Sequence, residues 1–149
     1  MSTKLLIRPY QGDDEQQVID LWFRCHLVSP TNNPQRDIAR KLQVNPELFL
    51  VGIIAEQIVA TCMAGYEGHR GWINYLAVDP DYQHQGIGTH VMAVAEAKLA
   101  ERGCAKINLM VRAANSEVIT FYTRLGFVQD AVVCMGKRLE HDPPYPHSE

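Results

Sequence analysis

The sequence predicts a single domain of mixed α/β class, with a mostly antiparallel central sheet and packed helices. Three observations support this. Two neighbouring runs rich in β-branched residues, 48–55 and 58–66, form a hairpin pattern, and residues 72–78 continue it as a third strand. Apolar residues recur at helical spacing over 87–99. Strand and helix patterns also alternate along the rest of the 149 residues, a length that suits one domain.

The N-terminal part pairs one strand with two helices. Leu5–Arg8 has the pattern of a short strand. Asp13 followed by Gln16 has the spacing of a capping box, so we expect the first helix to begin there. Two prolines make residues 29–34 a loop, after which a second helix is predicted to end before Pro46.

The second half continues the alternation. The long helix beginning at Ile87 is predicted to end at Gly103, a residue typical of a left-handed C-cap. Residues 106–111 have a strand pattern. Asn115 is a suitable N-cap for a further helix that runs to Leu125.

The end of the chain is predicted to leave the sheet in two steps. Residues 131–137 have the pattern of a last strand, whereas 141–149 contain three prolines that no central strand or helix tolerates. We therefore expect one domain over residues 1–140 and a flexible, Pro-rich tail over 141–149.

Composition argues against several classes of function. A net charge of −3 and a pI near 6.0 do not suit a nucleic-acid-binding surface. The four cysteines include no Cys-x-x-Cys pair, and no histidine stands at zinc-site spacing, so no metal site is expected. We expect the cysteines to be free thiols in a reducing compartment. The longest apolar run, 48–55, is too short to span a bilayer. We expect a cytoplasmic protein with no nucleic-acid or membrane partner.

The most informative segment joins strand 72–78 to the long helix and reads Gln83-His84-Gln85-Gly86-Ile87-Gly88. Its two glycines allow close approach of the main chain to a ligand, and the unpaired amides of a first helical turn favour negative charge. A phosphate-binding turn is therefore predicted, although a tight turn without ligand explains the loop alone equally well. Val91 stands where a dinucleotide fingerprint needs Gly or Ala, and the Gly-Lys-Ser/Thr of a P-loop is absent.

A second pattern lies downstream and comprises Asn115, Phe121-Tyr122 and Leu125-Gly126-Phe127. Together with the loop, it resembles the GNAT superfamily of acetyl-CoA-dependent N-acetyltransferases. The loop is similar to that family's Gln/Arg-x-x-Gly-x-Gly/Ala, and the downstream block to its Asn-x₆-Tyr-x₃-Gly-Phe. Shorter motifs, among them Asp37-Ile38, look like the bacterial YpeA-type branch. The resemblance covers nearly everything except the tail.

The resemblance implies acetyl-CoA as the donor, with its pyrophosphate bound by main-chain N–H groups of the loop. It also implies a GNAT fold with helices on both faces and a bulged strand ending at Val78, splayed from strand 106–111 so that the pantetheine arm enters between them. The expected acetyl-CoA-binding residues are Leu76, Ala77, Val78, Gln83, His84, Gln85, Gly86, Ile87, Gly88, Thr89, Asn115 and Tyr122.

Two catalytic roles follow from the resemblance. The N–H of Val78 would face the thioester oxygen, and Tyr122 would protonate the departing thiolate; an ordinary half-buried helix tyrosine is the alternative for Tyr122. Asn115 would contact the cofactor arm, a role compatible with helix capping. The family's usual general-base positions align with Trp72 and Met110, which cannot accept a proton.

The general base is therefore unassigned, with Glu67, Tyr75 and a water chain as candidates. The acceptor is expected on the side of loop 29–34, with Asn32, Asn33, Glu67 and Tyr75 as candidate substrate-binding residues. The predicted reaction is direct acetyl transfer to a primary amine of a small molecule or peptide in a ternary complex. A non-catalytic CoA-binding or regulatory module and an acyltransferase using another acyl-CoA are alternatives. A monomer and a homodimer both fit the sequence.

Overall fold

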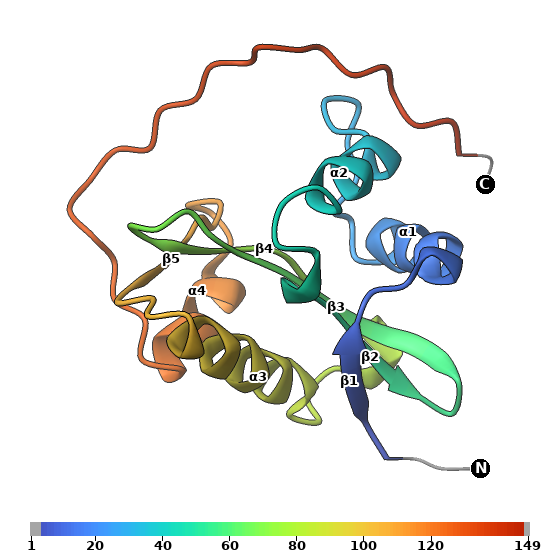
Figure 1. Cartoon of the computed structure of the whole chain (residues 1–149), viewed down its shortest axis with the longest axis horizontal. Helices are drawn as coiled ribbons and strands as arrows, with labels where there is room; N and C mark the ends of the chain where they lie inside the picture. Colours follow the sequence, from blue (N-terminus) through green and yellow to red (C-terminus); the bar gives the residue numbers. More distant parts are fainter. Residues whose placement is uncertain (1–3, 148–149) are drawn as a thin grey trace.

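The computed structural model describes residues 4–147 and consists of one mixed sheet covered by helices on both faces (Figure 1). The sheet has the order β1-β2-β3-β4-β5. Its strands are β1 (Leu6–Pro9), β2 (Phe49–Ile54), β3 (Gln57–Tyr66), β4 (Gly71–Val78) and β5 (Ile107–Leu109). The helices are α1 (Glu15–Arg24), α2 (Pro34–Lys41), α3 (Ile87–Glu101) and α4 (Ser116–Arg124), with short 3-10 turns at Gly12–Asp14, Pro46–Leu48 and Pro80–Tyr82. The predicted mixed α/β class is confirmed.

Strands β1 to β4 pair antiparallel, whereas β4 and β5 run parallel and pair only along Gly71–Ile73 and Ile107–Leu109. A bulge interrupts the β3–β4 pairing, because Tyr75 and Leu76 together stand opposite Cys62. Beyond the bulge, β4 continues along β3 without β5 on its other side. The predicted bulge and splay of the middle strands are therefore present.

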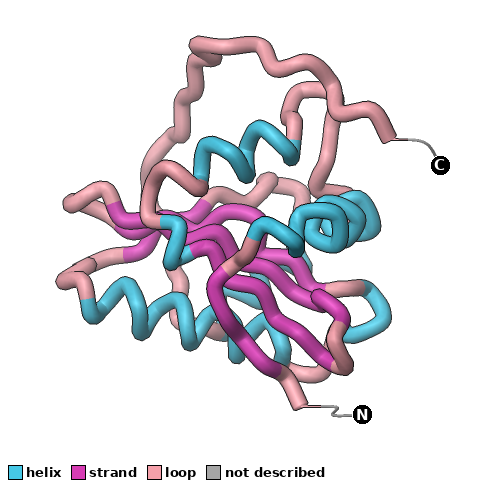
Figure 2. Tube along the Cα trace, turned by 45° about the vertical axis from the view of Figure 1, so that its right-hand side comes forward, coloured by secondary structure: helices cyan, strands magenta, loops and turns pink. Residues whose placement is uncertain are grey.

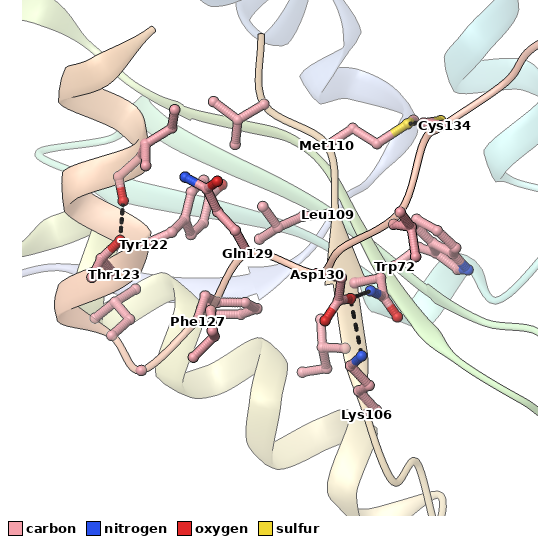
Figure 3. A pocket seen from close by; sticks show the side chains of 18 of the residues that line it. Trp72, Lys106, Leu109, Met110, Tyr122, Thr123, Phe127, Gln129, Asp130 and Cys134 are labelled. Atoms are coloured by element: carbon pink, nitrogen blue, oxygen red, sulfur yellow. Dashed lines mark hydrogen bonds and ion pairs between the residues drawn. The ribbon is translucent and has the colours of Figure 1, made fainter. Parts of the chain in front are cut away.

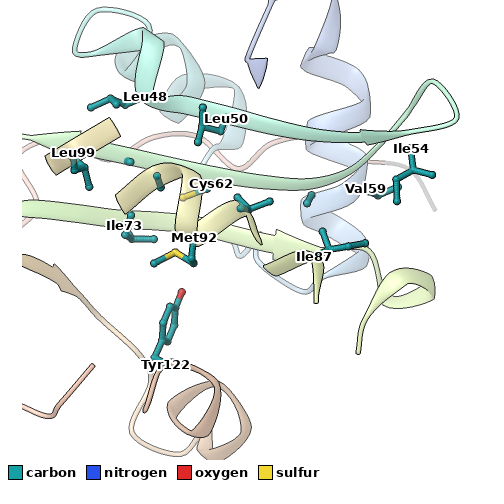
Figure 4. Packing of buried hydrophobic residues seen from close by; sticks show 14 residues of the cluster. Leu48, Leu50, Ile54, Val59, Cys62, Ile73, Ile87, Met92, Leu99 and Tyr122 are labelled. Atoms are coloured by element: carbon teal, nitrogen blue, oxygen red, sulfur yellow. The ribbon is translucent and has the colours of Figure 1, made fainter. Parts of the chain in front are cut away.

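Alternation along the strands divides the apolar side chains between two cores. The first packs α3 and α4 against one face of the sheet and includes Leu48, Leu50, Val91 and Tyr122 (Figure 4). The second packs α1 and α2 against the other face, where Trp22 has no exposed surface. At the end of β4 that β5 does not pair with, helices α3 and α4 therefore lie on one face of the strand, and α1 and α2 lie on the other.

The β2–β3 hairpin is confirmed, although its turn carries unusual residues. Ala55 and Glu56 have φ angles of 50° and 66°, the left-handed conformation that two-residue hairpin turns require and that Asn-Gly normally supplies. The turn forms because the flanking strands are buried, and it does so at a local energetic cost.

Replacing this turn by Asn-Gly is expected to stabilise the protein. Ala55→Asn combined with Glu56→Gly should raise the free energy of unfolding by about 1–2 kcal/mol, because the new residues accept positive φ more readily. Urea denaturation followed by circular dichroism measures the change. Glu117→Gly, in the first turn of α4, should instead lower stability. Unchanged stability of the turn variant would contradict the strain.

The predicted capping residue at the start of α1 and the predicted last strand were both wrong. The carboxylate that organises the start of α1 is Asp14, not Asp13: it accepts from the Gln11 N–H at 2.8 Å and pairs with Arg8 at 2.7 Å. Arg8 lies on β1, so tertiary structure chooses which of the two neighbouring aspartates is used.

The predicted last strand, 131–137, is absent from the part of the chain that the structure describes: these residues are exposed and pair with no strand of the sheet. Asp130 is bound by the side chains of Lys106 and Asn108, each at 3.0 Å, after which the chain leaves β5 and passes around to the side of α1 and α2 (Figures 1 and 2). A β-rich sequence forms a strand only with a partner edge, and β5 is three residues long.

Candidate active site

The glycine loop places three successive backbone N–H groups at the start of α3. Gly86 is the N-cap of α3 with φ 81° and ψ 7°, a left-handed conformation directly before helical residues. Among residues 4–147, no hydrogen-bond acceptor is found for the N–H groups of Ile87, Gly88 and Thr89. A left-handed residue followed by right-handed ones forms a concave group of N–H donors, and the helix dipole adds positive potential. The loop geometry therefore suits a phosphate group.

The side chains of this loop are arranged differently from its backbone. Gln83 donates from Nε2 to the Val78 carbonyl at 3.2 Å, so its amide is directed back at the end of β4. His84 and Gln85 are exposed and make no hydrogen bond among the described residues, whereas the Ile87 side chain is buried. Of the polar groups in this loop, the backbone N–H groups at the start of α3 are the ones available to an anion.

The end of β4 presents a further backbone donor. The Asp79 N–H donates to the Val59 carbonyl at 2.8 Å, toward β3. Since successive strand residues point their N–H groups to opposite edges, the Val78 N–H points to the edge that β5 does not cover. Leu76 and Val78 pack against the α3–α4 core, while the Ala77 side chain lies in the other core and can offer a ligand on the α3 side its backbone alone.

Helix α4 connects the loop to a cavity of about 1350 Å³. A Cβ atom on Gly88 would lie 3.2 Å from the Phe121 ring and 3.5 Å from Val78, so α4 packs directly on the first turn of α3. The next residue, Tyr122, lines the cavity together with Trp72, Leu109, Met110 and Phe127 (Figure 3). The predicted binding loop and the predicted general acid are thus joined through two consecutive residues of one helix.

Tyr122 is buried at the edge of the core (Figure 4). Phe121 and Phe127 lie edge-on to its ring at centroid distances of 5.1 and 5.5 Å. Within the described chain its hydroxyl has no hydrogen-bond partner, although every fully enclosed polar side-chain atom has one. The hydroxyl therefore reaches accessible space. Burial, and then the nearby Cys62, raise the pKa of Tyr122, so it keeps its proton at neutral pH. This is the state that a general acid needs.

On the other face of β4, a polar network joins Asn32 and Tyr75, two of the residues expected on the acceptor side. Asn32 Nδ2 donates to the Tyr75 hydroxyl at 2.7 Å, and that hydroxyl donates to Asp37 Oδ2 at 2.6 Å. Trp22 stacks on the Tyr75 ring at 3.8 Å and donates to Thr61 Oγ1 at 2.9 Å. From the sequence, Asp37 was identified only as part of a family motif and was not assigned to the site, because its approach to β4 depends on tertiary packing.

This network bears on the unassigned base. Burial, followed by the hydrogen bond to Asp37, raises the pKa of Tyr75, so its hydroxyl remains a donor at neutral pH. Glu67 lies in the β3–β4 turn, where it accepts from the N–H groups of His69 and Arg70, at the opposite end of β4 from Val78. Neither residue is arranged to accept a proton near Val78.

Asn33 and Asn115 each cap a helix. Asn33 accepts from Arg36 N at 3.1 Å at the start of α2, and Asn115 accepts from Val118 N at 3.3 Å at the start of α4. The capping prediction for Asn115 is confirmed, and its cofactor contact stays a prediction.

Two variants of Asn115 separate these roles. Asn115→Ala should lower the free energy of unfolding by about 1 kcal/mol through loss of the cap, whereas Asn115→Ser should retain most of it. If the amide also contacts acetyl-CoA, both variants should weaken binding in calorimetric titration. Normal affinity of the serine variant would restrict Asn115 to capping.

Neither a metal centre nor a membrane span is found over residues 4–147. No three His, Cys, Asp or Glu side chains gather as metal ligands there, and none of the helices in this range is long and apolar enough to cross a membrane.

Comparison with known proteins agrees with this geometry. The model of the acetyltransferase (GNAT) family matches residues 15–127. An acetyltransferase of Sodalis glossinidius (strain morsitans) is 49% identical over 140 residues, covering 93% of this chain and 99% of that protein.

Two solved structures share the fold. The ribosomal-protein-S18-alanine N-acetyltransferase from Escherichia coli has a TM-score of 0.73 at 24% identity, over 86% of this chain and 80% of that one. AAC(6')-Iy, solved with the bisubstrate analogue CoA-S-monomethyl-acetylneamine, has a TM-score of 0.75 at 15% identity, over 91% and 99%. The family match and the close relative establish that this chain is an acyltransferase that belongs to the GNAT family of acetyltransferases.

Proposed function

We propose that the protein transfers the acetyl group of acetyl-CoA to a primary amine, directly and within a ternary complex. The observation that carries the proposal is the junction of α3 and α4. There Gly88, in the first turn of α3, packs against Phe121, and the adjacent Tyr122 has a hydroxyl without a hydrogen-bond partner among the described residues. The N–H groups of residues 87–89 have no acceptor in the same part of the chain. A pyrophosphate site and a proton donor are two of the parts that thioester aminolysis requires.

The donor would lie along the open edge of β4. Its pyrophosphate would take the N–H groups of residues 87–89, and the acyl end would lie near the Val78 N–H, which points to that edge. A backbone donor at this place stabilises the oxygen that becomes negative when the carbonyl carbon is attacked. AAC(6')-Iy, of the same fold, binds a CoA-containing analogue, which supports the assignment.

The reaction then proceeds by attack of the amine, cleavage of the thioester and transfer of a proton to the leaving thiolate. The amine nitrogen attacks the thioester carbon, the carbon–sulfur bond breaks, and Tyr122 gives its proton to the thiolate while the acetylated nitrogen releases one to solvent. The Tyr122 phenolate is reprotonated from solvent. Trp72 and Met110 cannot act as the base, so the amine enters in its neutral form or loses its proton to water.

The acceptor would enter from the α1–α2 side, where Asn32, Tyr75 and Asp37 form their network. One of the two solved proteins is named a ribosomal-protein-S18-alanine N-acetyltransferase, and the other was solved with an analogue that contains acetylneamine. A peptide amine and an aminoglycoside amine are therefore the first acceptor classes to test. The proposed setting is the cytoplasm, with residues 1–140 as the catalytic domain in a monomer or homodimer.

Release of CoA thiol from acetyl-CoA tests the proposal, using an alanine-starting peptide, neamine and putrescine as acceptors and mass spectrometry of the products. We expect amine-dependent thiol release and a monoacetylated product. Tight acetyl-CoA binding without turnover across the panel would indicate a binding module instead. Faster turnover of a longer acyl-CoA would make acetyl the wrong group.

A further inference from the structure

We propose that the C-terminal segment 140–147 is part of the acceptor side, and that Asp142 and Pro143 are positioning residues that hold loop 29–34 and α2 against β4. The segment contacts both helices of this layer, unlike the exposed residues that lead to it. This inference rests on the proposed function, because it assigns the segment a place in acceptor binding.

Asp142 provides the strongest contact. Its carboxylate receives two hydrogen bonds from Arg40, Nη1 to Oδ2 at 2.7 Å and Nη2 to Oδ1 at 2.6 Å, and Arg36 lies 3.6 Å away. The Asp142 side chain is 4% exposed although it belongs to a terminal, Pro-rich segment. A covered carboxylate is costly unless it is paired, and this two-point pairing with arginine is specific in geometry. Glu140 adds a contact to Arg40 at 2.9 Å.

The side chain of Asn33 binds the backbone of the segment. Its Oδ1 caps α2, and its Nδ2 donates to the Pro143 carbonyl at 2.9 Å. Asn33 is itself buried, so both ends of its amide are used. The residue adjacent to Asn32 thereby attaches the terminal segment to the acceptor loop.

The far end of the segment reaches α1. The His147 ring stacks on Phe23 at a centroid distance of 3.7 Å, and Tyr145 lies 6.1 Å from the same ring. Tyr145 also packs against the core of this layer. The segment therefore spans α2 and α1, the two helices that loop 29–34 connects.

A chain of polar contacts leads from Asp142 to the bulge of β4. Arg40 binds Asp142 and also lies 3.5 Å from Asp37, whose other oxygen accepts from Tyr75. Tyr75 stands at the bulge, three residues before Val78, with φ 50°. Removing the carboxylate of Asp142 should leave Arg40 with Asp37 and Glu140 as partners and loosen α2 relative to β4.

The donor site should not sense this change, because it is built from α3, α4 and the other face of the sheet. A selective effect on acceptor binding therefore distinguishes positioning from a general loss of structure.

The test compares a chain ending after Leu139, Asp142→Asn, Asp142→Glu and the control Glu47→Gln, which breaks an exposed pair with Arg102. The acceptor is the panel amine that gives the highest turnover. We expect the truncation and Asp142→Asn to raise its KM about tenfold while acetyl-CoA affinity stays within about twofold. Asp142→Glu, which keeps the charge, should recover part of the loss. Amide NMR signals of Asn32, Asp37 and Tyr75 should shift in the first two variants.

An unchanged acceptor KM together with unshifted amide signals would overturn the inference. A parallel loss of acetyl-CoA affinity would also overturn it, since that indicates general destabilisation. If the wild-type protein acetylates no amine, the proposed function fails and the acceptor role fails with it. An active wild-type protein whose acceptor KM does not change in Asp142→Asn would overturn the inference and leave the proposed function intact.

Discussion

Replacing Tyr122 by phenylalanine is expected to lower kcat about tenfold or more while acetyl-CoA affinity and fold are preserved. The hydroxyl has no hydrogen-bond partner among the described residues, so its loss should cost little stability. The ring and its contacts with Phe121 and Phe127 remain. What disappears is the proton for the thiolate, and general acids contribute roughly 10²–10⁴ in rate.

Steady-state thiol release at saturating donor and acceptor measures this loss, with calorimetry for donor binding. The matched control is Tyr66→Phe, whose hydroxyl contacts the Gly68 carbonyl in a turn and should not affect turnover. Because burial raises the pKa of Tyr122, wild-type kcat should show no loss of this acid as pH rises from 7 to about 9. Unchanged turnover in Tyr122→Phe would rule out the general-acid role.

Replacing Gly88 by leucine is expected to weaken acetyl-CoA binding by at least about tenfold and to lower the free energy of unfolding by about 1–3 kcal/mol. A Cβ at this position already meets Phe121 at 3.2 Å, and the larger side chain must displace that ring or the first turn of α3. Either movement disturbs the N–H groups proposed to bind pyrophosphate and shifts α4, which carries Tyr122.

Calorimetric titration with acetyl-CoA and urea denaturation measure the two effects. Gly12→Leu is the control, since a Cβ there has no neighbour within 4 Å among the described residues. Normal affinity in a folded Gly88→Leu protein would show that a ligand does not use the first turn of α3.

Much of the fold follows from local sequence signals. The β2–β3 hairpin, α3 with its glycine loop, and the cap at Asn115 all depend on residues that are close in sequence, and all are present. The family resemblance added a bulge in the strand that ends at Val78, which the run of apolar residues alone does not predict. The structure places this bulge at Tyr75 and Leu76.

Other features depend on contacts between distant parts of the chain. Residues 131–137 have β propensity, but the edge of β5 that they would pair with is short. The segment that follows is bound by Arg40, through Asp142, and by Asn33, through Pro143, and both pairs are more than a hundred positions apart in sequence. Asp37 joins the acceptor side through its hydrogen bond to Tyr75, 38 residues later. Local periodicity contains no information about either pairing.

In the proposed complex, acetyl-CoA binds at the N-terminus of α3 with its acyl end near Val78 and Tyr122. Titrating ¹⁵N-labelled protein with acetyl-CoA and following backbone amide shifts tests it most directly. We expect the largest shifts on residues 86–89, on Val78 and on Tyr122, with the N–H signals of Ile87 and Gly88 most affected. Absence of binding, or shifts concentrated elsewhere in the protein, would contradict it.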